Sequence, residues 1–211
     1  MIAIIDYGMG NTKSVYNAFQ LLGENVILTD DIKELKTADA LVLPGVGSFS
    51  DGMKNLIERN LIGLLNELVI EQKKPYLGIC LGLEFLANHS YEGGTKTQGF
   101  GWINGEIKKI QTSEKDLKVP HMGWDDTKII KKTTLLNELE SPIFYYLHSY
   151  FFDIADNEKD CITSVCNYGG TQITSTLQKE NIFAVQFHPE KSQSTGIKLL
   201  KNFLDGIHAE K

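Results

Sequence analysis

Residues 75–82, Pro75-Tyr76-Leu77-Gly78-Ile79-Cys80-Leu81-Gly82, decide the fold prediction. An apolar strand is predicted to end at Cys80, and a short helix is predicted to follow it. Gly78 and Gly82 flank the cysteine in the Gly-x-nucleophile-x-Gly pattern of a strand–turn–helix elbow, which needs small residues because neighbouring backbone passes close by. The elbow predicts a cysteine nucleophile at the carboxyl end of a strand, where a helix N-terminus favours the thiolate. The alternative is a buried structural cysteine beside two loop glycines.

The segments before this elbow alternate between apolar strands and amphipathic helices. Strands are predicted at 2–5, 25–28 and 40–43, and a first helix around Val15–Leu22 is closed by Gly23. A second helix is predicted from Asp51 to Glu71, because its apolar residues recur at spacings of three and four. Nearly continuous apolar strands that alternate with helices are typical of a parallel sheet covered on both faces.

The second half of the chain has few helical patterns before its last predicted helix, which spans about Thr195–Ile207. This half is therefore expected to add antiparallel or mixed β-structure to an α/β fold with a mostly parallel central sheet. No repeat or linker is apparent, so residues 1–211 are expected to form a single domain. The strand-like stretches are Phe100–Ile110, Val119–His121, Phe144–Phe152, Cys161–Asn167, Gln172–Leu177 and Ile182–Phe187.

Charge and composition exclude several classes of function. The chain has 211 residues and a net charge of −6, and Arg59 is its single arginine. Nucleic-acid binding is not expected, because a surface that follows phosphates needs clustered lysine and arginine. No apolar run approaches the ~20 residues that cross a bilayer, and the first residues lack the basic start of a secretory signal. Three cysteines do not form a disulfide scaffold at this length, so we expect a cytoplasmic protein.

A cysteine nucleophile needs a base, and the base needs an orienting group. His188 stands in Phe187-His188-Pro189-Glu190, directly after the predicted strand that ends at Phe187. Parallel sheets collect their active sites at strand ends. Glu190, two residues later, can turn back and hold one imidazole nitrogen while the other faces Cys80. The predicted catalytic triad is therefore Cys80, His188 and Glu190.

Acyl chemistry also needs N–H donors for the oxyanion that develops in the transition state. The backbone N–H of Leu81, directly after the nucleophile, is the first candidate. A second donor is expected from the glycine-rich loop Pro44-Gly45-Val46-Gly47, which can approach a substrate closely. An ordinary turn is the alternative for this loop.

The remaining histidines and cysteines are interpreted as structural. His121 and His148 lie in apolar, strand-like settings, whereas His89 and His208 are expected to be exposed. No histidine or cysteine cluster has metal-ligand spacing along the chain, so no metal site is predicted. No cofactor is expected either, because Lys13 replaces the third glycine of a dinucleotide-binding pattern. Cys161 and Cys166, five positions apart, should face opposite sides of a regular strand.

The motifs together resemble the class I glutamine amidotransferases and, within them, the glutaminase subunits of imidazole glycerol phosphate synthases. The Cys80 elbow and His-Pro-Glu are found throughout the class. Residues 6–11 (DYGMGN) and 120–124 (PHMGW) resemble the narrower group. The matching stretches run in order over nearly the whole chain: residues 5–11 (IDYGMGN), 43–49 (LPGVGSF), 78–82 (GICLG), 99–102 (GFGW), 119–124 (VPHMGW), 148–150 (HSY) and 186–192 (QFHPEKS).

This resemblance implies a flavodoxin-like sheet and a glutaminase that channels ammonia to a (β/α)₈-barrel synthase (cyclase) partner in a heterodimer, for histidine biosynthesis. It implies that Gly47 and Leu81 supply oxyanion donors, and that Ser149 and Tyr150 hold the amino-acid end of glutamine by backbone contacts. Trp124, Tyr145 and Lys191 resemble residues at the face against the partner.

Two departures from the resembled pattern keep other functions open. Glu84 stands four residues after the nucleophile, where glutamine is common in the family and contacts the substrate. Phe151 replaces a second tyrosine that often follows Tyr150. Related pairs that amidate a surface-polysaccharide sugar are therefore the first alternative. The others are a stand-alone γ-glutamyl cysteine hydrolase and a non-catalytic binding subunit.

Overall fold

The computed structural model describes residues 1–112 and 117–209, built around an eight-stranded sheet with the order β2-β1-β3-β4-β14-β13-β12-β9. The first five strands of this order, β2-β1-β3-β4-β14, pair in parallel. The last three, β13, β12 and β9, pair antiparallel with their neighbours. The predicted change from parallel to antiparallel pairing in the second half is therefore confirmed. The strands are β1 (Ile2–Ile5), β2 (Val26–Thr29), β3 (Ala40–Gly45), β4 (Tyr76–Cys80), β9 (Lys128–Ile129), β12 (Ile162–Tyr168), β13 (Thr171–Lys179) and β14 (Ile182–Val185).

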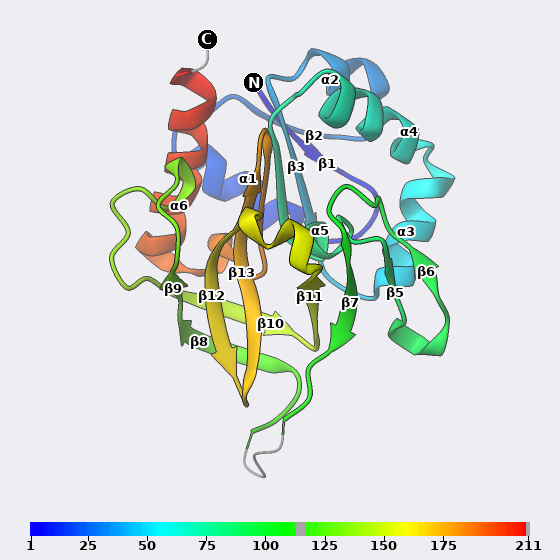
Figure 1. Ribbon diagram of the computed structural model, residues 1–211. Helices are drawn as coiled ribbons and strands as arrows, with labels where there is room; N and C mark the ends of the chain where they lie inside the picture. The colour runs from blue at the N-terminus through cyan, green and yellow to red at the C-terminus, as the bar shows by residue number, and fades with distance from the viewer. Residues whose placement is uncertain (113–116, 210–211) are drawn as a thin grey trace.

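Helices cover both faces of this sheet (Figure 1). Helices α1 (Thr12–Leu21) and α6 (Gln193–Ala209) pack on one face. Helices α2 (Ile32–Thr37), α3 (Phe49–Glu58) and α4 (Leu61–Leu65) pack on the other. Successive residues of a strand point to opposite faces, and β1 accordingly sends Ile2 and Ile4 into the first layer and Ala3 and Ile5 into the second. Its four residues are all buried, which explains their continuous apolar character.

The prediction of a single helix over Asp51–Glu71 is wrong. Helix α3 ends at Glu58, α4 follows, and a π-helical turn, η1 (Asn66–Glu71), completes the segment. Asn60 has a left-handed backbone (φ 57°), which asparagine tolerates better than most residues, and it turns the chain between α3 and α4. The apolar spacing survives the break because both helices bury their leucines against the same face of the sheet.

Two small sheets complete the second half. Strand β8 (His121–Asp126) pairs with β10 (Ile143–His148), and β11 (Tyr150–Ile154) pairs with β7 (Gly105–Lys109). The stretch Phe144–Phe152, predicted as one strand, is therefore two strands in different sheets that separate at Ser149. Strand β7 begins at Gly105, five residues later than predicted. The shorter elements are β5 (His89–Ser90), β6 (Thr97–Gln98) and the 3₁₀ turns η2 (Glu92–Gly94), η3 (Thr134–Leu136), η4 (Asp156–Cys161) and η5 (Pro189–Lys191).

The cysteine side chains outside the elbow face opposite layers as predicted, but Cys161 lies in the turn η4 just before β12 and not in the strand itself. Cys161 and Cys166 are both buried, and they belong to the two opposite core layers. Among the described residues, no helix is both long and apolar enough to cross a membrane.

Candidate active site

Strand β4 ends in the predicted elbow at Cys80, and α5 (Leu81–Glu84) follows directly. Cys80 has φ 54° and ψ −105°, a strained backbone for a residue with a side chain. A Cβ on Gly78 would lie 2.5 Å from the carbonyl oxygen of Gly82, and one on Gly82 would lie 1.9 Å from that of Leu43. The close passage of backbone that requires glycine at both positions is therefore confirmed. The predicted short helix α5 has only four residues, so its dipole contributes little to the stability of a thiolate.

The neighbouring strand β14 carries the predicted base to the same edge of the sheet. Strands β4 and β14 are parallel, with Val185 opposite Ile79. The chain beyond β14 then reaches His188, whose Nδ1–H donates to Glu190 Oε1 at 2.9 Å. Both side chains are almost fully buried, at 2% and 1% exposure. The two-residue offset between them thus produces the turn back that the sequence predicts.

The electrostatics of His188 favour a charged imidazolium. Burial alone would lower its pKa, but the negative charge of Cys80 and the hydrogen bond that His188 donates to Glu190 outweigh burial and raise the pKa to about 10. Its second nitrogen, Nε2, is buried and makes no well-formed hydrogen bond within the described residues. The Cys80 sulfur is the group whose charge raises the pKa of this imidazole most. Catalytic hydrogen bonds are often loose before substrate binds. This arrangement can hold a thiolate–imidazolium pair.

A pocket of about 290 Å³ opens over Cys80, and the predicted oxyanion and substrate residues all line it. Gly47 has φ +112°, a backbone conformation that favours glycine. The carbonyls of Ser149 and Tyr150 already accept hydrogen bonds from Ile110 and His148. The described residues that line the pocket are Val46, Gly47, Cys80, Leu81, Glu84, Glu92, Pro120, Leu147, His148, Ser149 and Tyr150.

Glu84 is the most unusual group in the pocket. It is a buried carboxyl that accepts a hydrogen bond from Gln186 Nε2 at 3.1 Å. Burial raises its pKa to about 8; the Gln186 hydrogen bond opposes this shift and the nearby Glu92 charge adds to it. At neutral pH, Glu84 is therefore mostly an uncharged acid.

Three residues at the site were given no role by the sequence reasoning. Gln186 lies 3.9 Å from the Cys80 sulfur as well as bonding Glu84. The Asn11 amide donates to Glu190 Oε1 at 3.4 Å and thereby supports the orienting carboxylate. The Tyr7 hydroxyl is buried, and burial followed by the charges of Cys80 and Glu84 raises its pKa far above the ordinary value. All three residues stand inside quoted motifs, which is the only signal that the sequence carried for them.

The three residues predicted for a partner face lie together outside the pocket. Trp124 is 47% exposed and its ring contacts that of Tyr145 edge-on at 5.8 Å. The Lys191 ammonium lies 5.7 Å from the centre of the Tyr145 ring. On the inner side, the Tyr145 carbonyl accepts the backbone N–H of His188 at 2.8 Å. This exposed aromatic group is therefore one hydrogen bond from the predicted base.

Comparison with known proteins identifies the family of the chain. The model of the family "Glutamine amidotransferase class-I" matches residues 3–207. The chain is 45% identical to imidazole glycerol phosphate synthase subunit HisH 1 of Campylobacter jejuni strain RM1221 over 97% of this chain and 99% of that protein. It is also 45% identical to subunit HisH 2 of Methanococcus maripaludis, over 97% and 98% of the two chains.

Solved structures with low sequence identity share the fold. The structure of PurLQS from Thermotoga maritima superimposes with a TM-score of 0.71 at 19% identity, covering 98% of this chain and 98% of that one. Sequence and fold thus agree over nearly the full length, and the chain belongs to the class-I glutamine amidotransferase family.

Proposed function

We propose that this chain is the cytoplasmic glutaminase subunit of an imidazole glycerol phosphate synthase, acting as one domain over residues 1–211. It hydrolyses glutamine to glutamate and delivers the ammonia to a (β/α)₈-barrel synthase partner in histidine biosynthesis. The observation that carries the proposal is the meeting of the Cys80 elbow with the buried His188–Glu190 pair at one edge of the sheet. Full-length relatives that bear this subunit's name support the choice of pathway.

The chemistry follows from the positions of the three triad residues. The Cys80 thiolate attacks the γ-carboxamide carbon of glutamine, and the resulting oxyanion accepts hydrogen bonds from the Leu81 and Gly47 backbone. His188 gives its proton to the leaving nitrogen, ammonia departs, and a thioester remains on Cys80. His188 then takes a proton from water, whose hydroxide oxygen displaces the thiolate and forms glutamate. One oxyanion donor of this kind is typically worth about 10²–10³ in rate.

The neutral state of Glu84 fits a substrate-binding role. A charged carboxylate in this position would repel the α-carboxylate of glutamine, where the family commonly has a neutral glutamine side chain. A protonated Glu84, however, keeps one acceptor oxygen for Gln186 and offers an O–H donor to the pocket. In this state Glu84 offers one acceptor oxygen and one donor, as a glutamine side chain also does.

The partner surface is proposed to act on the catalytic base. Strand β10 carries Tyr145 in the exposed aromatic group and Leu147 and His148 in the pocket wall. Since the Tyr145 carbonyl holds the His188 backbone N–H, a partner that displaces β10 changes the position of the imidazole. We therefore expect low glutaminase activity from the isolated chain. Full turnover without the partner would contradict this coupling.

Cys80→Ala tests the proposal directly. Reconstituted with its barrel partner, the variant should release no glutamate from glutamine, yet bind the partner and support synthesis from added ammonia. The matched control Cys161→Ser, a buried thiol in the opposite part of the core, should keep both activities. Loss of the ammonia-driven reaction in a folded Cys80→Ala complex would argue against a separate glutaminase role.

Two further measurements separate the alternatives. An electrophilic diazoketone analogue of glutamine should alkylate Cys80, as detected by mass spectrometry, and an absent adduct would favour a binding subunit. Exchange of the barrel partner identifies the acceptor: glutamine-driven turnover only with a sugar-amidating barrel would overturn the histidine-pathway choice and leave the glutaminase chemistry intact.

A further inference from the structure

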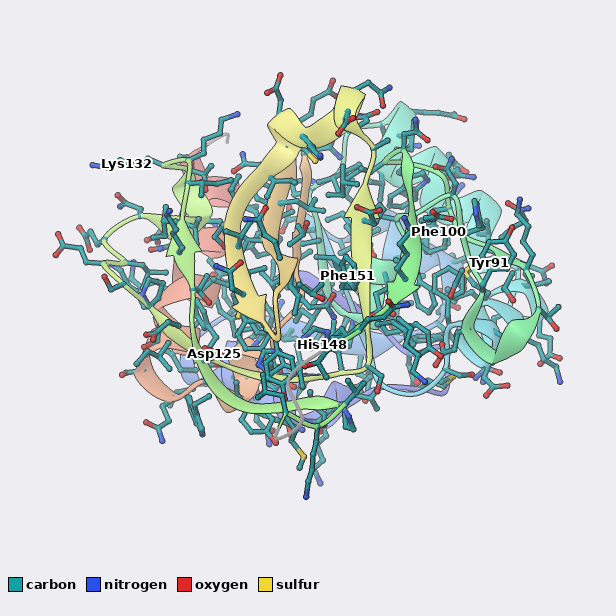
Figure 2. All side chains as sticks on the ribbon, turned by 60° about the horizontal axis from the view of Figure 1, so that its bottom comes forward. Tyr91, Phe100, Asp125, Lys132, His148 and Phe151 are labelled. Carbon is teal, nitrogen blue, oxygen red and sulfur yellow. The ribbon has the colours of Figure 1, made fainter. Side chains whose placement is uncertain are left out.

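A buried group of possible ligands lies beside the pocket and has no role in the glutaminase chemistry. His121 and Asp125 come from one face of β8, and Cys166 comes from β12. One ligand atom from each residue, the His121 nitrogen, a carboxylate oxygen and the Cys166 sulfur, lies within 4.8 Å of the other two. Figure 2 labels Asp125 and His148; Asp125 belongs to β8, and His148 of β10 pairs with His121 of the same strand β8. The ligands are distant along the chain, which is why residue spacing gave no metal signal.

With both imidazoles neutral, one of the three polar contacts in this group is left without a hydrogen. His148 Nδ1 faces the Tyr150 carbonyl at 2.7 Å, and His148 Nε2 faces His121 Nδ1 at 3.1 Å. His121 Nε2 then faces Asp125 Oδ2 at 3.2 Å. These three contacts each need a hydrogen, but two neutral imidazoles carry only two N–H groups.

The first two contacts take both available hydrogens. The Tyr150 carbonyl can only accept, so His148 donates from Nδ1 and accepts at Nε2, and His121 donates from Nδ1. His121 Nε2 is then a lone pair directed at the Asp125 carboxylate, and two acceptors face each other. Either an additional proton or a metal cation must lie between them. The same hydrogen bond from His121 Nδ1 fixes the tautomer in the way that supporting residues do for metal-bound histidine.

The imidazole of His121 is held rigidly in this orientation. It stacks between the rings of Tyr146 and Tyr168, at centroid distances of 4.7 Å and 4.0 Å. His121 and Cys166 are 2% exposed, while the Asp125 side chain is 32% exposed. An ion can therefore enter from solvent past Asp125 and reach two preorganised, buried ligands.

We propose that His121 Nε2, the Asp125 carboxylate and Cys166 Sγ bind a divalent zinc-class ion, with water as the fourth ligand. Nitrogen, oxygen and thiolate donors together suit Zn²⁺ and not Mg²⁺ or Ca²⁺, which prefer oxygen. Tetrahedral ligands around zinc lie roughly 3.5 Å apart, so small side-chain rotations close the site. Cys166 releases its thiol proton to water on binding. The ion would tie β8 to β12 and fix His148, which lines the pocket.

Cobalt titration of the full chain tests this site independently of glutaminase activity. The untagged protein carries Cys80→Ala and Cys161→Ser, which leaves Cys166 as its single thiol. We expect one equivalent of Co²⁺ to bind with a near-ultraviolet thiolate-to-cobalt absorption band, and Zn²⁺ to displace it. Cys166→Ser should abolish the band.

Asp125→Asn provides the decisive comparison, because its amide N–H can donate to His121 Nε2 and so keeps the fold without the ion. Its affinity for Co²⁺ should fall at least tenfold, a lower bound taken from the loss that even supporting residues cause. The matched control Asp126→Asn, the next and exposed residue of β8, should bind as before. Three results would overturn the proposal: no saturable binding, a band that survives Cys166→Ser, or equal affinities of the two asparagine variants. A proton between His121 and Asp125 would then satisfy the contact.

Discussion

Replacement of Glu84 by glutamine should change the pH dependence of stability, because the native fold holds this carboxyl protonated. Burial raises its pKa from 4.5 to about 8, and Gln186 opposes the shift without cancelling it. The folded state therefore binds a proton that the unfolded state has lost between these two pKa values. Stability must then fall as pH rises through that interval, by about 1.4 kcal/mol per unit.

The magnitude can be worked out for three pH values. Relative to low pH, Glu84 lowers the free energy of unfolding by about 1 kcal/mol at pH 5, about 3 kcal/mol at pH 7 and about 5 kcal/mol at pH 9. The loss levels off above the folded-state pKa. Glu84→Gln keeps the acceptor for Gln186 and cannot ionise. Its free energy of unfolding, relative to the unmodified chain, should therefore increase by about 4 kcal/mol between pH 5 and pH 9.

Urea unfolding of both chains at these pH values measures the difference, and the other titrating groups cancel in the comparison. Glu71→Gln, on an exposed residue, serves as the control and should show little difference at any pH. Loss of this proton should raise the KM for glutamine above pH 8 in the unmodified chain and not in Glu84→Gln. A stability difference that stays constant within about 1 kcal/mol from pH 5 to pH 9 would refute a neutral, buried carboxyl.

Three further outcomes follow from other contacts. Glu190→Gln should lower kcat by about 10²-fold or more in steady-state assays of the complex, because the imidazolium at His188 loses its carboxylate partner. Gly82→Ala should lower the free energy of unfolding in urea by at least about 3 kcal/mol, since its Cβ would lie 1.9 Å from the Leu43 carbonyl oxygen. The control Gly63→Ala has open space around its Cβ and should be neutral or stabilising by up to about 1 kcal/mol. Trp124→Ala should weaken partner binding in calorimetry by about 2 kcal/mol or more without unfolding the chain, because this exposed indole fits an interface anchor.

The sequence predicted most accurately those features that are set by local backbone requirements. Only a glycine fits at Gly82, because Leu43 O leaves no room for a Cβ, and so the elbow could be predicted from five residues. The alternation of buried strands with helices followed from apolar runs such as Ile2–Ile5, all of whose side chains are buried. These signals are local, and tertiary packing did not override them.

Features that depend on contacts between distant segments could not be predicted in this way. The periodicity of residues 51–71 is unchanged by the turn at Asn60, because both helices face the same side of the sheet. The neutral state of Glu84 depends on its burial among distant segments, and the residue that opposes it by hydrogen bonding, Gln186, lies 102 positions away. Likewise, His121 and Cys166 meet only because β8 and β12 lie side by side, and no spacing rule along the chain describes that meeting.

The position of the triad shows why a parallel sheet suits this chemistry. Strands β4 and β14 are adjacent and parallel, so their carboxyl ends open at the same edge, with Ile79 opposite Val185. The nucleophile follows one strand directly, while the base needs a short extension that the His188–Glu190 turn provides. In an antiparallel pair the corresponding strand ends would lie at opposite edges, and the thiol and imidazole could not meet. The change to antiparallel pairing occurs only beyond β14, at β13, so the reacting residues come from the parallel side of that boundary.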